Sequence, residues 1–222
     1  MDKQFIVCGI DTDCGKSTTS VLLYQYFKER LKEDSIIIKP LQTGNALDTD
    51  FYTSCGIPQE KIINFETYKS ETSLHLAALL EQKNIQLAHI VQQITKQVES
   101  HRLSPVIIEL AGGLMSPINQ KQSMLDIVKA LNLPVILVVS SYLGSLNHTL
   151  LTLKVLQSEG IDILGLLFNQ VRAEEGIITD SNDYLKNFTG LPILGYIPYL
   201  TDYHQTMTSE TEKSKLIRNW RV

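Results

Sequence analysis

A short apolar run near the start of the chain leads directly into a glycine-bounded loop and then into a helical segment. Residues 5–8 read Phe-Ile-Val-Cys, which is typical of a strand buried on both faces. Gly9 and Gly15 bound the loop, and Lys16 and Ser17 follow the second glycine. A Gly-Lys-Ser loop between a strand and a helix is the setting that binds phosphate. The segment therefore predicts an α/β fold with a nucleotide phosphate site after its first strand.

The residue types in this loop suit a bound triphosphate. Gly15 allows the backbone N–H groups to turn inward, and Lys16 supplies a compact positive charge for the β- and γ-phosphates. The Ser17 hydroxyl can ligate Mg²⁺, and the amphipathic helix predicted over about 18–33 adds the positive end of its dipole. Five residues separate the two glycines here, one more than in the common motif.

Composition is that of an ordinary globular protein. At 222 residues we expect one domain with a sizeable core, spanning 1–222. The net charge of −4 argues against a nucleic-acid surface, and no apolar stretch is long enough to span a bilayer. Residues 1–4 lack the features of a signal peptide, and the three cysteines form no CxxC pair. These features predict a reduced, cytoplasmic setting.

Apolar runs of strand length alternate with helical stretches along the chain. The alternation predicts a mostly parallel sheet with helices on both faces. We expect the polar tail after Thr201 to be a mobile flap or a loose end. The expected strands are 5–8, 35–38, 106–109, 135–139, 163–168 and 193–197. The further expected helices are 48–55, 74–81, 88–101, 124–131, 147–159 and 180–188.

Unusual residues follow the ends of five predicted strands. In an open parallel sheet the carboxyl ends of the strands share one edge, and ligands bind along that edge. We therefore expect the clusters to converge on one site. They are residues 9–17, 39–44, 109–113, 140–145 and Asn169.

Two charged residues stand where otherwise apolar strands end. Lys39 would project towards the phosphate loop, where a second ammonium suits a reaction that builds negative charge between ATP and a substrate. The alternative is a solvated lysine before a turn-forming proline. Glu109 follows the apolar run Val-Ile-Ile, and a buried carboxylate must be paired or bound to metal. In enzymes with a phosphate loop, an acid at the end of a strand usually helps to hold Mg²⁺. The alternative is a Glu that caps the next turn. Gly112 and Gly113 then free the backbone to approach a ligand closely.

Several other candidates have competing structural explanations. Asp50 precedes a helix, so N-capping competes with metal binding. Cys14 is either an activated thiol at a helix N-terminus or a small filler. The helix start at residues 144–147 could bind a carboxylate through its free N–H groups, and an ordinary Ser or Asn cap explains it equally well. Four aspartates add acid near the same edge: Asp11, Asp13, Asp48 and Asp50.

In this order and spacing, the clusters resemble the dethiobiotin synthetase family over about residues 4–200. Among the departures from the family pattern, three deserve weight, and none of them removes a catalytic group type: Asp13 replaces Glu, Leu74 replaces Pro and Leu110 replaces Gly. The matching motifs are Gly-Thr-Asp-Thr-Glu-x-Gly-Lys-Thr at 9–17, Lys-Pro-x-x-[Ser/Thr]-Gly at 39–44, Ser-Pro-His-x-Ala at 73–77, Glu-Gly-Ala-Gly-Gly at 109–113, Leu-Gly-x-x-Asn-His at 143–148, Asn169 and the segment 195–198.

The resemblance implies an activity and a set of site residues. Members make dethiobiotin from 7,8-diaminopelargonate, CO₂ and ATP with Mg²⁺, as homodimers whose helix start at 144–147 binds the substrate carboxylate of the other subunit. The implied catalytic residues are Lys16, Lys39 and Thr12. The implied nucleotide-binding residues are Asp13, Cys14, Gly15, Lys16, Ser17, Thr18, Glu109, Asn169, Pro198 and Tyr199. The implied metal site is Ser17, Asp50 and Glu109. The implied substrate residues are Thr12, Lys39, Thr43, Gly112, Gly113, Gly144, Ser145, Leu146 and Asn147.

Two other functions are compatible with a phosphate loop. A ParA/MinD-like ATPase switch would carry an extra lysine near the start of the loop, and residues 9–14 contain none. The synthetase half of a cobyrinate-type amidotransferase normally needs a glutaminase domain, for which 222 residues leave no room. Stimulation of ATP hydrolysis by 7,8-diaminopelargonate plus bicarbonate would discriminate among the three.

Overall fold

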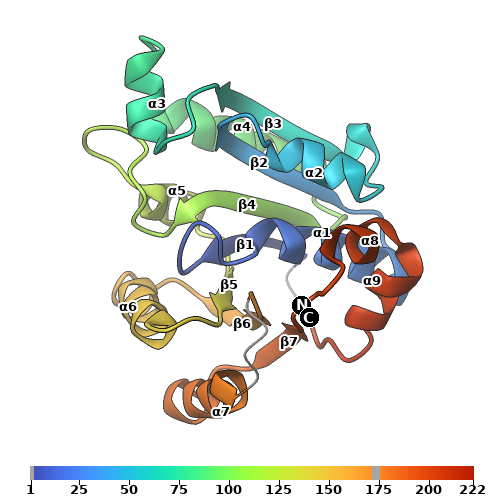
Figure 1. Cartoon of the computed structure of the whole chain (residues 1–222). Coiled ribbons are helices and arrows are strands. Elements are labelled where there is room, and N and C mark those ends of the chain that lie inside the picture. Colours follow the sequence, from blue (N-terminus) through green and yellow to red (C-terminus); the bar gives the residue numbers. More distant parts are fainter. Residues whose placement is uncertain (1–2, 172–175) are drawn as a thin grey trace.

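A seven-stranded parallel sheet runs through the middle of the molecule (Figure 1). The computed structural model describes residues 3–171 and 176–222. The strand order across the sheet is β3-β2-β4-β1-β5-β6-β7. The strands are β1 (Gln4–Gly9), β2 (Ile36–Thr43), β3 (Ile62–Tyr68), β4 (Val106–Gly113), β5 (Val135–Ser140), β6 (Ile163–Asn169) and β7 (Ile193–Ile197).

Helices cover both faces of the sheet. Crossovers between parallel strands are right-handed. The crossover from β1 to β2 runs towards the β3 edge of the sheet, whereas those from β3 to β4 and from β4 to β5 run towards the β7 edge. The two sets of crossovers therefore lie on opposite faces of the sheet. Helix α1 packs with α2 and α9, and α4 packs with α5 (Figure 1). The helices are α1 (Lys16–Tyr26) with its π-helical continuation η1 (Phe27–Leu31), α2 (Asp48–Ser54), the 3-10 turn η2 (Gln59–Lys61), α3 (Leu74–Leu80), α4 (Leu87–Ser100), α5 (Met124–Leu131), α6 (Ser145–Ser158), α7 (Gly176–Thr189), α8 (Tyr203–Thr208) and α9 (Glu210–Leu216).

All six predicted strands are present, and the sheet has one more. Strand β3 was not predicted, because Asn64, Glu66 and Thr67 interrupt its apolar pattern. It lies at the edge of the sheet, where β2 is its one partner strand among the described residues, so polar side chains cost little there. Among residues 3–171 and 176–222, no helix is long and apolar enough to cross a membrane.

Helix α1 differs from the amphipathic helix predicted over about 18–33. Every residue of α1 except Ser17 is buried, because the sheet covers one side while α2 and α9 cover others. The helical backbone continues through the π-helical turn to Leu31 and ends at Lys32, which has φ 57°. Polar residues on this helix therefore face neighbouring elements rather than solvent.

The tail also differs from the mobile flap or loose end that its polarity predicts. Residues after Thr201 form α8 and α9, and Met207, Ile217 and Trp220 are buried. The Trp220 ring lies against Gly195, where an added Cβ would come within 2.6 Å of it. A few well-spaced apolar anchors are enough to dock the segment, although its average composition is polar.

The strand register brings the carboxyl ends of the strands to one edge. Gly9 of β1 pairs with Gly113 of β4 and with Val138 of β5. Ser140 of β5 pairs with Asn169 of β6, and the latter pairs with β7. The clusters singled out in the sequence therefore lie along one edge of the sheet, as their positions after the strands predict.

Candidate active site

The loop between β1 and α1 is closed against the end of β6. Gly15 has φ 95° and is the N-cap of α1. An added Cβ there would lie 1.9 Å from Asn169 Nδ2, so only glycine fits. The Asn169 amide donates to the Cys14 carbonyl oxygen over 3.0 Å. In this structure, the residue that the family resemblance assigns to adenine holds the shape of the loop.

The Lys16 side chain is buried and folds back on its own loop. Its ammonium donates to the carbonyl oxygens of Asp11 and Thr12 over 2.8 and 2.7 Å. Cys14 is also buried, and its sulfur would lie 2.3 Å from a Cβ added at Gly9. The packing supports the reading of Cys14 as a small filler. The two carbonyl oxygens hold the ammonium within the loop, and Lys16 also lines the cavity described below.

Glu109, at the end of β4, is fully buried and is the centre of a hydrogen-bond cluster. Its Oε1 lies 2.8 Å from Ser17 Oγ and accepts from Lys39 Nζ over 2.9 Å. Its Oε2 accepts from Ser20 Oγ and from Tyr52 Oη over 2.5 and 2.6 Å. A buried carboxylate is tolerated only when it is paired in this way. The geometry therefore excludes a glutamate that merely caps the next turn.

The Lys39 ammonium joins two carboxylates. It lies 2.6 Å from Asp48 Oδ2 and 2.9 Å from Glu109 Oε1, and the lysine side chain is only 2% exposed. Burial alone would lower the pKa of Lys39, but the two carboxylates outweigh burial and raise it. Burial would likewise raise the pKa of Asp48, but the Lys39 ammonium outweighs it and lowers that pKa. Lys39 is therefore a buried, charged residue and not a solvated lysine before a turn.

Asp48, and not the predicted Asp50, is the aspartate of α2 that contacts Ser17 and Lys39. Asp48 contacts Ser17 Oγ and Lys39 Nζ, whereas Asp50 is exposed in the first turn of α2. Two residues along a helix correspond to a rotation of about 200°, so these side chains point to opposite sides. Asp50 does not cap the helix either, since Leu47 holds the N-cap position.

Lys16, Lys39 and Asp48 border a cavity of about 660 Å³ at the carboxyl edge of the sheet, whereas Glu109 is fully buried and does not line it. Gly112, with φ 69°, borders it where an added Cβ would lie 2.4 Å from Ser116 Oγ. Two of the departures from the family pattern, Asp13 and Leu74, also border it, whereas Leu110 is buried in the core. The predicted site residues that line the cavity are Thr12, Asp13, Gly15, Lys16, Ser17, Thr18, Lys39, Thr43, Gly112 and Asn169.

Proteins of similar sequence share one name. A protein of Lawsonia intracellularis named ATP-dependent dethiobiotin synthetase BioD is 36% identical to this chain, over 91% of the chain and 91% of the relative. A protein of Halalkalibacterium halodurans with the same name is 30% identical over 98% of the chain and 93% of the relative. The chain belongs to the dethiobiotin synthetase family. A family model described as an AAA domain also matches residues 3–206.

Solved structures of other ATPases share the fold of this dethiobiotin synthetase family member. A ParA family ATPase from Chlorobium tepidum superposes with a TM-score of 0.57 at 14% identity, covering 97% of this chain and 92% of that one. The septum site-determining protein MinD from Pyrococcus horikoshii, solved with Mg-ADP, gives 0.58 at 14% identity over 97% and 90%. At such identities the likeness shows the fold alone, and it confirms the predicted parallel sheet of the phosphate-loop ATPase type.

The residues that the dethiobiotin synthetase resemblance assigns to the substrate carboxylate lie outside this cavity. Gly144 is the N-cap of α6 with φ 99°, and Ser145 is buried. Leu146 is half-buried and Asn147 is exposed. Beside them, Tyr142 Oη lies 2.7 Å from His148 Nδ1. The helix start therefore has no side-chain cap among the described residues, and it does not line the cavity, although the Tyr142 hydroxyl beside it donates to Asp11 Oδ2 of the phosphate loop over 3.4 Å.

Oxygen donors in the cluster suit Mg²⁺. Ser17 Oγ is within hydrogen-bonding distance of both Asp48 and Glu109, but a hydroxyl has one proton and can serve only one carboxylate at a time. A hard cation beside Ser17 would accept oxygens from both sides, as Mg²⁺ does. No group of three or more His, Cys, Asp or Glu residues able to hold a metal occurs in 3–171 or 176–222. Any Mg²⁺ would thus depend on Ser17 and on other oxygens, such as those of phosphate.

Prediction from the sequence missed Ser20, Tyr52 and Tyr203 and gave Asp48 too little weight. Asp48 and Tyr52 lie one helical turn apart on α2, and Ser17 and Ser20 lie one turn apart on α1, so each pair shares a face towards Glu109. That spacing is a signal that could have found Tyr52 and Ser20. Nothing in the local sequence points to Tyr203, which lines the cavity from α8.

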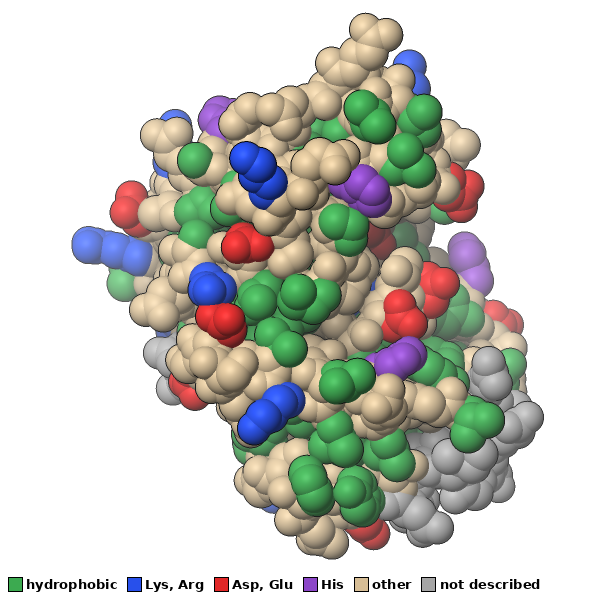
Figure 2. Space-filling view, turned by 90° about the vertical axis from the view of Figure 1, so that its left-hand side faces the viewer, with side chains coloured by type: hydrophobic (Ala, Val, Ile, Leu, Met, Phe, Trp, Pro, Cys, Tyr) green, Lys and Arg blue, Asp and Glu red, His purple; other side chains and the backbone are tan. Residues whose placement is uncertain are grey.

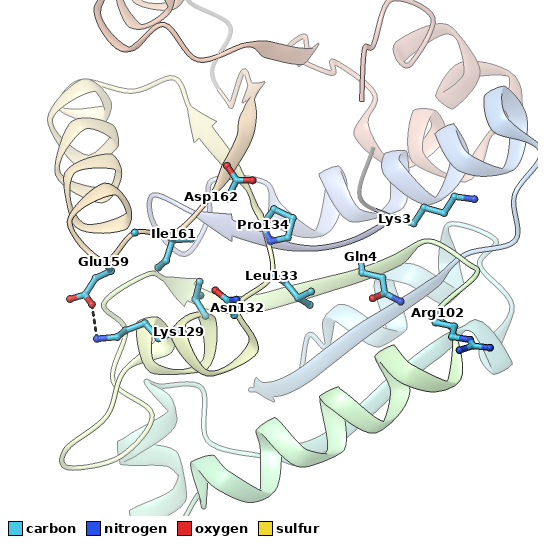
Figure 3. Close-up of a pocket in the computed structure, with 12 residues that line it drawn as sticks. Lys3, Gln4, Arg102, Lys129, Asn132, Leu133, Pro134, Glu159, Ile161 and Asp162 are labelled. Atoms are coloured by element: carbon cyan, nitrogen blue, oxygen red, sulfur yellow. Dashed lines mark ion pairs between the residues drawn. The ribbon is translucent and has the colours of Figure 1, made fainter.

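A second cavity, of about 690 Å³, lies at the opposite edge of the sheet (Figure 3). It is bordered by the start of β1, the loops before β5 and β6, and the end of α5. Its charged side chains, among them Lys3, Arg102 and Asp162, are on the surface. Its one drawn ion pair, Lys129 with Glu159, is also partly exposed. None of the residues predicted for the site of a dethiobiotin synthetase lies here.

Proposed function

We propose that this protein uses ATP to carboxylate 7,8-diaminopelargonate and close the ring that makes dethiobiotin. Family membership supports the reaction, and one structural observation carries it: Lys39, held between Glu109 and Asp48, faces the same cavity as the phosphate loop. Two fixed ammonium groups, Lys16 and Lys39, then flank the space between nucleotide and substrate. Such preorganised positive charge stabilises developing oxyanions.

The proposed chemistry has three steps. An amine of the substrate adds to CO₂ and loses a proton to give a carbamate. A carbamate oxygen attacks the γ-phosphorus of ATP, and the bond to the bridging oxygen breaks, releasing ADP. The second amine then attacks the carbamoyl carbon of this mixed anhydride and expels phosphate, which closes the ring. Charge develops on oxygens throughout, so Lys16, Lys39 and the N–H groups of the loop carry the catalysis, with Thr12 and Thr43 as polar clamps.

Mg²⁺ would neutralise phosphate charge during this reaction. Ser17 and Asp48, with Glu109 directly or through water, are the residues that would hold it, and Asp48 takes the place that the sequence assigns to Asp50. The adenine would lie near Asn169, with Pro198 and Tyr199 following β7 beside it. These assignments rest on residue chemistry and on the shared edge of the sheet.

We further propose that the protein works as a homodimer with a shared substrate site. The face that carries α6 and the loop after β1 presents hydrophobic side chains among polar ones (Figure 2). Met115 is 60% exposed and Leu151 58%, and both border a surface hollow of about 370 Å³. Exposed apolar groups of this kind mark association surfaces. A second copy seated there would bring its own helix start at Gly144–Asn147 towards the cavity.

The reaction is tested by ATP hydrolysis. Release of phosphate should require both 7,8-diaminopelargonate and bicarbonate, and dethiobiotin should form in equal amount. Hydrolysis that proceeds at the same rate without the diamine would contradict the proposal and favour an ATPase switch.

The shared site is tested by mixing two inactive variants. Lys16→Ala removes the positive charge that meets the phosphates, and Ser145→Asp places a carboxylate where the substrate carboxylate would bind. Because Ser145 is buried, a thermal melt must show that the Ser145→Asp protein is folded. Mixed dimers hold one intact site if the site is shared, so about a quarter of wild-type turnover should return. No recovery in a mixture that exchanges subunits would place the whole site within one chain. Ser209→Asp, at the N-cap of α9, is the matched control.

A further inference from the structure

An aromatic pair from two distant segments stands at the rim of the active-site cavity. Phe51 of α2 and Tyr203 of α8 stack with ring centroids 6.0 Å apart and planes 14° apart. Figure 1 shows these two short helices side by side at the carboxyl edge of the sheet. Tyr203 is 44% exposed and borders the cavity. The stack fixes the plane of the ring, so the phenol hydroxyl has a defined position.

That hydroxyl meets the phosphate loop. Tyr203 Oη lies 2.6 Å from Thr18 Oγ1, and Thr18 directly follows Lys16 and Ser17 in the first turn of α1. Burial raises the pKa of Tyr203, so its phenol stays protonated and can donate a hydrogen bond at neutral pH. Thr18 is itself buried, and both residues line the cavity. The hydroxyl groups of Thr18 and Tyr203 thus form a hydrogen bond with each other at the rim of the cavity.

The tail does not need this contact to stay docked. Met207, Ile217 and Trp220 are buried, and the buried Lys213 ammonium donates to the Cys55 carbonyl oxygen at the end of α2. Lys28 also pairs with Glu210. The Tyr203 hydroxyl is therefore a polar group placed at the site by a segment that is anchored elsewhere.

We propose that Tyr203 is a nucleotide-binding residue whose hydroxyl, beside Thr18, donates to the α-phosphate of bound ATP. In phosphate loops the lysine reaches the β- and γ-phosphates, while backbone N–H groups of the loop and of the helix N-terminus hold the α- and β-phosphates. Phe51 holds the ring in place. The inference rests on the ATP dependence proposed above and adds a contact supplied by the C-terminal helices.

The test is Tyr203→Phe in the full-length protein, with ATP and ADP binding measured by calorimetry. The ring and its stack remain, so the melting temperature should stay close to that of the wild type. We expect the Kd for both nucleotides to rise by the same factor, roughly tenfold, because each has an α-phosphate. The turnover number at saturating ATP should not change, whereas the KM for ATP should rise.

Tyr184→Phe is the matched control. Tyr184 is 45% exposed and stacks on Phe188 at 5.4 Å, but it lies on α7 away from the cavity lining. Its nucleotide affinities should equal those of the wild type. Phe51→Leu, which removes the stacking partner and keeps the hydroxyl, should weaken both nucleotides by a smaller factor than Tyr203→Phe.

Three outcomes would overturn the proposal. The first is an unchanged Kd for both nucleotides in folded Tyr203→Phe. The second is a loss confined to ATP, which would place the hydroxyl at the γ-phosphate. The third is a loss that disappears with 2′-deoxy-ATP, which would place it at the ribose. A wild type that binds ATP but does not turn over 7,8-diaminopelargonate would overturn the proposed reaction and leave this binding test intact.

Discussion

The two edges of the sheet carry cavities of nearly equal size and very different chemistry. The carboxyl-edge cavity has about 660 Å³ and is lined by the buried Lys39, which is 2% exposed and pairs with the fully buried Glu109. The amino-edge cavity has about 690 Å³, and its Lys129–Glu159 pair leaves those side chains 47% and 34% exposed (Figure 3). The two cavities are similar in volume and differ in how deeply their charged side chains are buried.

The difference follows from the direction of the strands. At the carboxyl edge the strands lead into loops that precede helix N-termini, whose free N–H groups and positive dipole ends favour anions. The amino edge meets helix C-termini, such as the end of α5, with surface lysines nearby. A buried charge costs free energy unless it is paired. Buried charged residues are therefore expected where they are paired or have a function. The predictions below test this contrast.

Lys16→Ala should have the largest effect on activity. The β- and γ-phosphates would lose their main fixed charge, so turnover should fall by about 10²–10³-fold or more. Among the described residues, the Lys16 ammonium bonds only to atoms of its own loop, so the fold should survive. Steady-state turnover with a thermal melt checks both points. Near-normal turnover in a folded variant would remove the phosphate-loop assignment.

Lys39→Met should have the largest effect on stability. It leaves the Glu109 and Asp48 carboxylates without their cation, and breaking a buried pair in this way costs about 3–5 kcal/mol. Urea denaturation measures the free energy of unfolding. Adding Glu109→Gln to Lys39→Met should recover part of the loss, since one unpaired charge is then removed. A double variant no more stable than Lys39→Met would mean that the loss comes from packing rather than charge.

Tyr52→Phe should have an intermediate effect. It removes one of two donors to Glu109 Oε2 in a fully buried setting, which costs about 1–3 kcal/mol. Tyr68→Phe is the control. The hydroxyl of the buried Tyr68 also donates to a carboxylate, but this carboxylate belongs to Glu66, which is only half-buried. The control should lose less free energy of unfolding. Equal losses would show that burial of the acid does not set the cost.

The Asp48 carboxylate should make stability depend on pH in one direction. Its pKa is lowered in the folded state, so its contribution is fully present above the unfolded value of about 3.9 and is lost as pH falls through the folded pKa. The stability difference between the wild type and Asp48→Asn should be constant near neutral pH and shrink in acid. Asp50→Asn, an exposed change in the same helix, is the control. A difference that grows in acid would contradict the Lys39 pairing.

Lys129→Met should have the smallest effect. Exposed ion pairs contribute little to stability, and the amino-edge cavity contains no predicted site residue. Turnover and melting temperature should match the wild type, in contrast to the same substitution at Lys39. A marked loss of turnover would mean that the amino edge takes part in function.

Much of the site could be predicted because its signals are local. The phosphate loop is one contiguous segment between a buried strand and a helix, and the apolar runs of six strands are short and continuous. The edge strand β3 was missed because an edge tolerates polar residues. The six apolar runs and the phosphate loop together predicted that the carboxyl ends of the strands share one edge. The clusters that follow these strands were therefore expected to meet there.

By itself, the sequence determined the class of fold, the phosphate loop and the edge at which the site forms. Only the tertiary structure decided which acid joins that site, because the phase of α2 turns Asp48 inward and Asp50 outward. It also decided that the polar tail docks and brings Tyr203 to Thr18, two residues 185 positions apart in the chain. Contacts over such separations depend on packing, and no local pattern of residues encodes them.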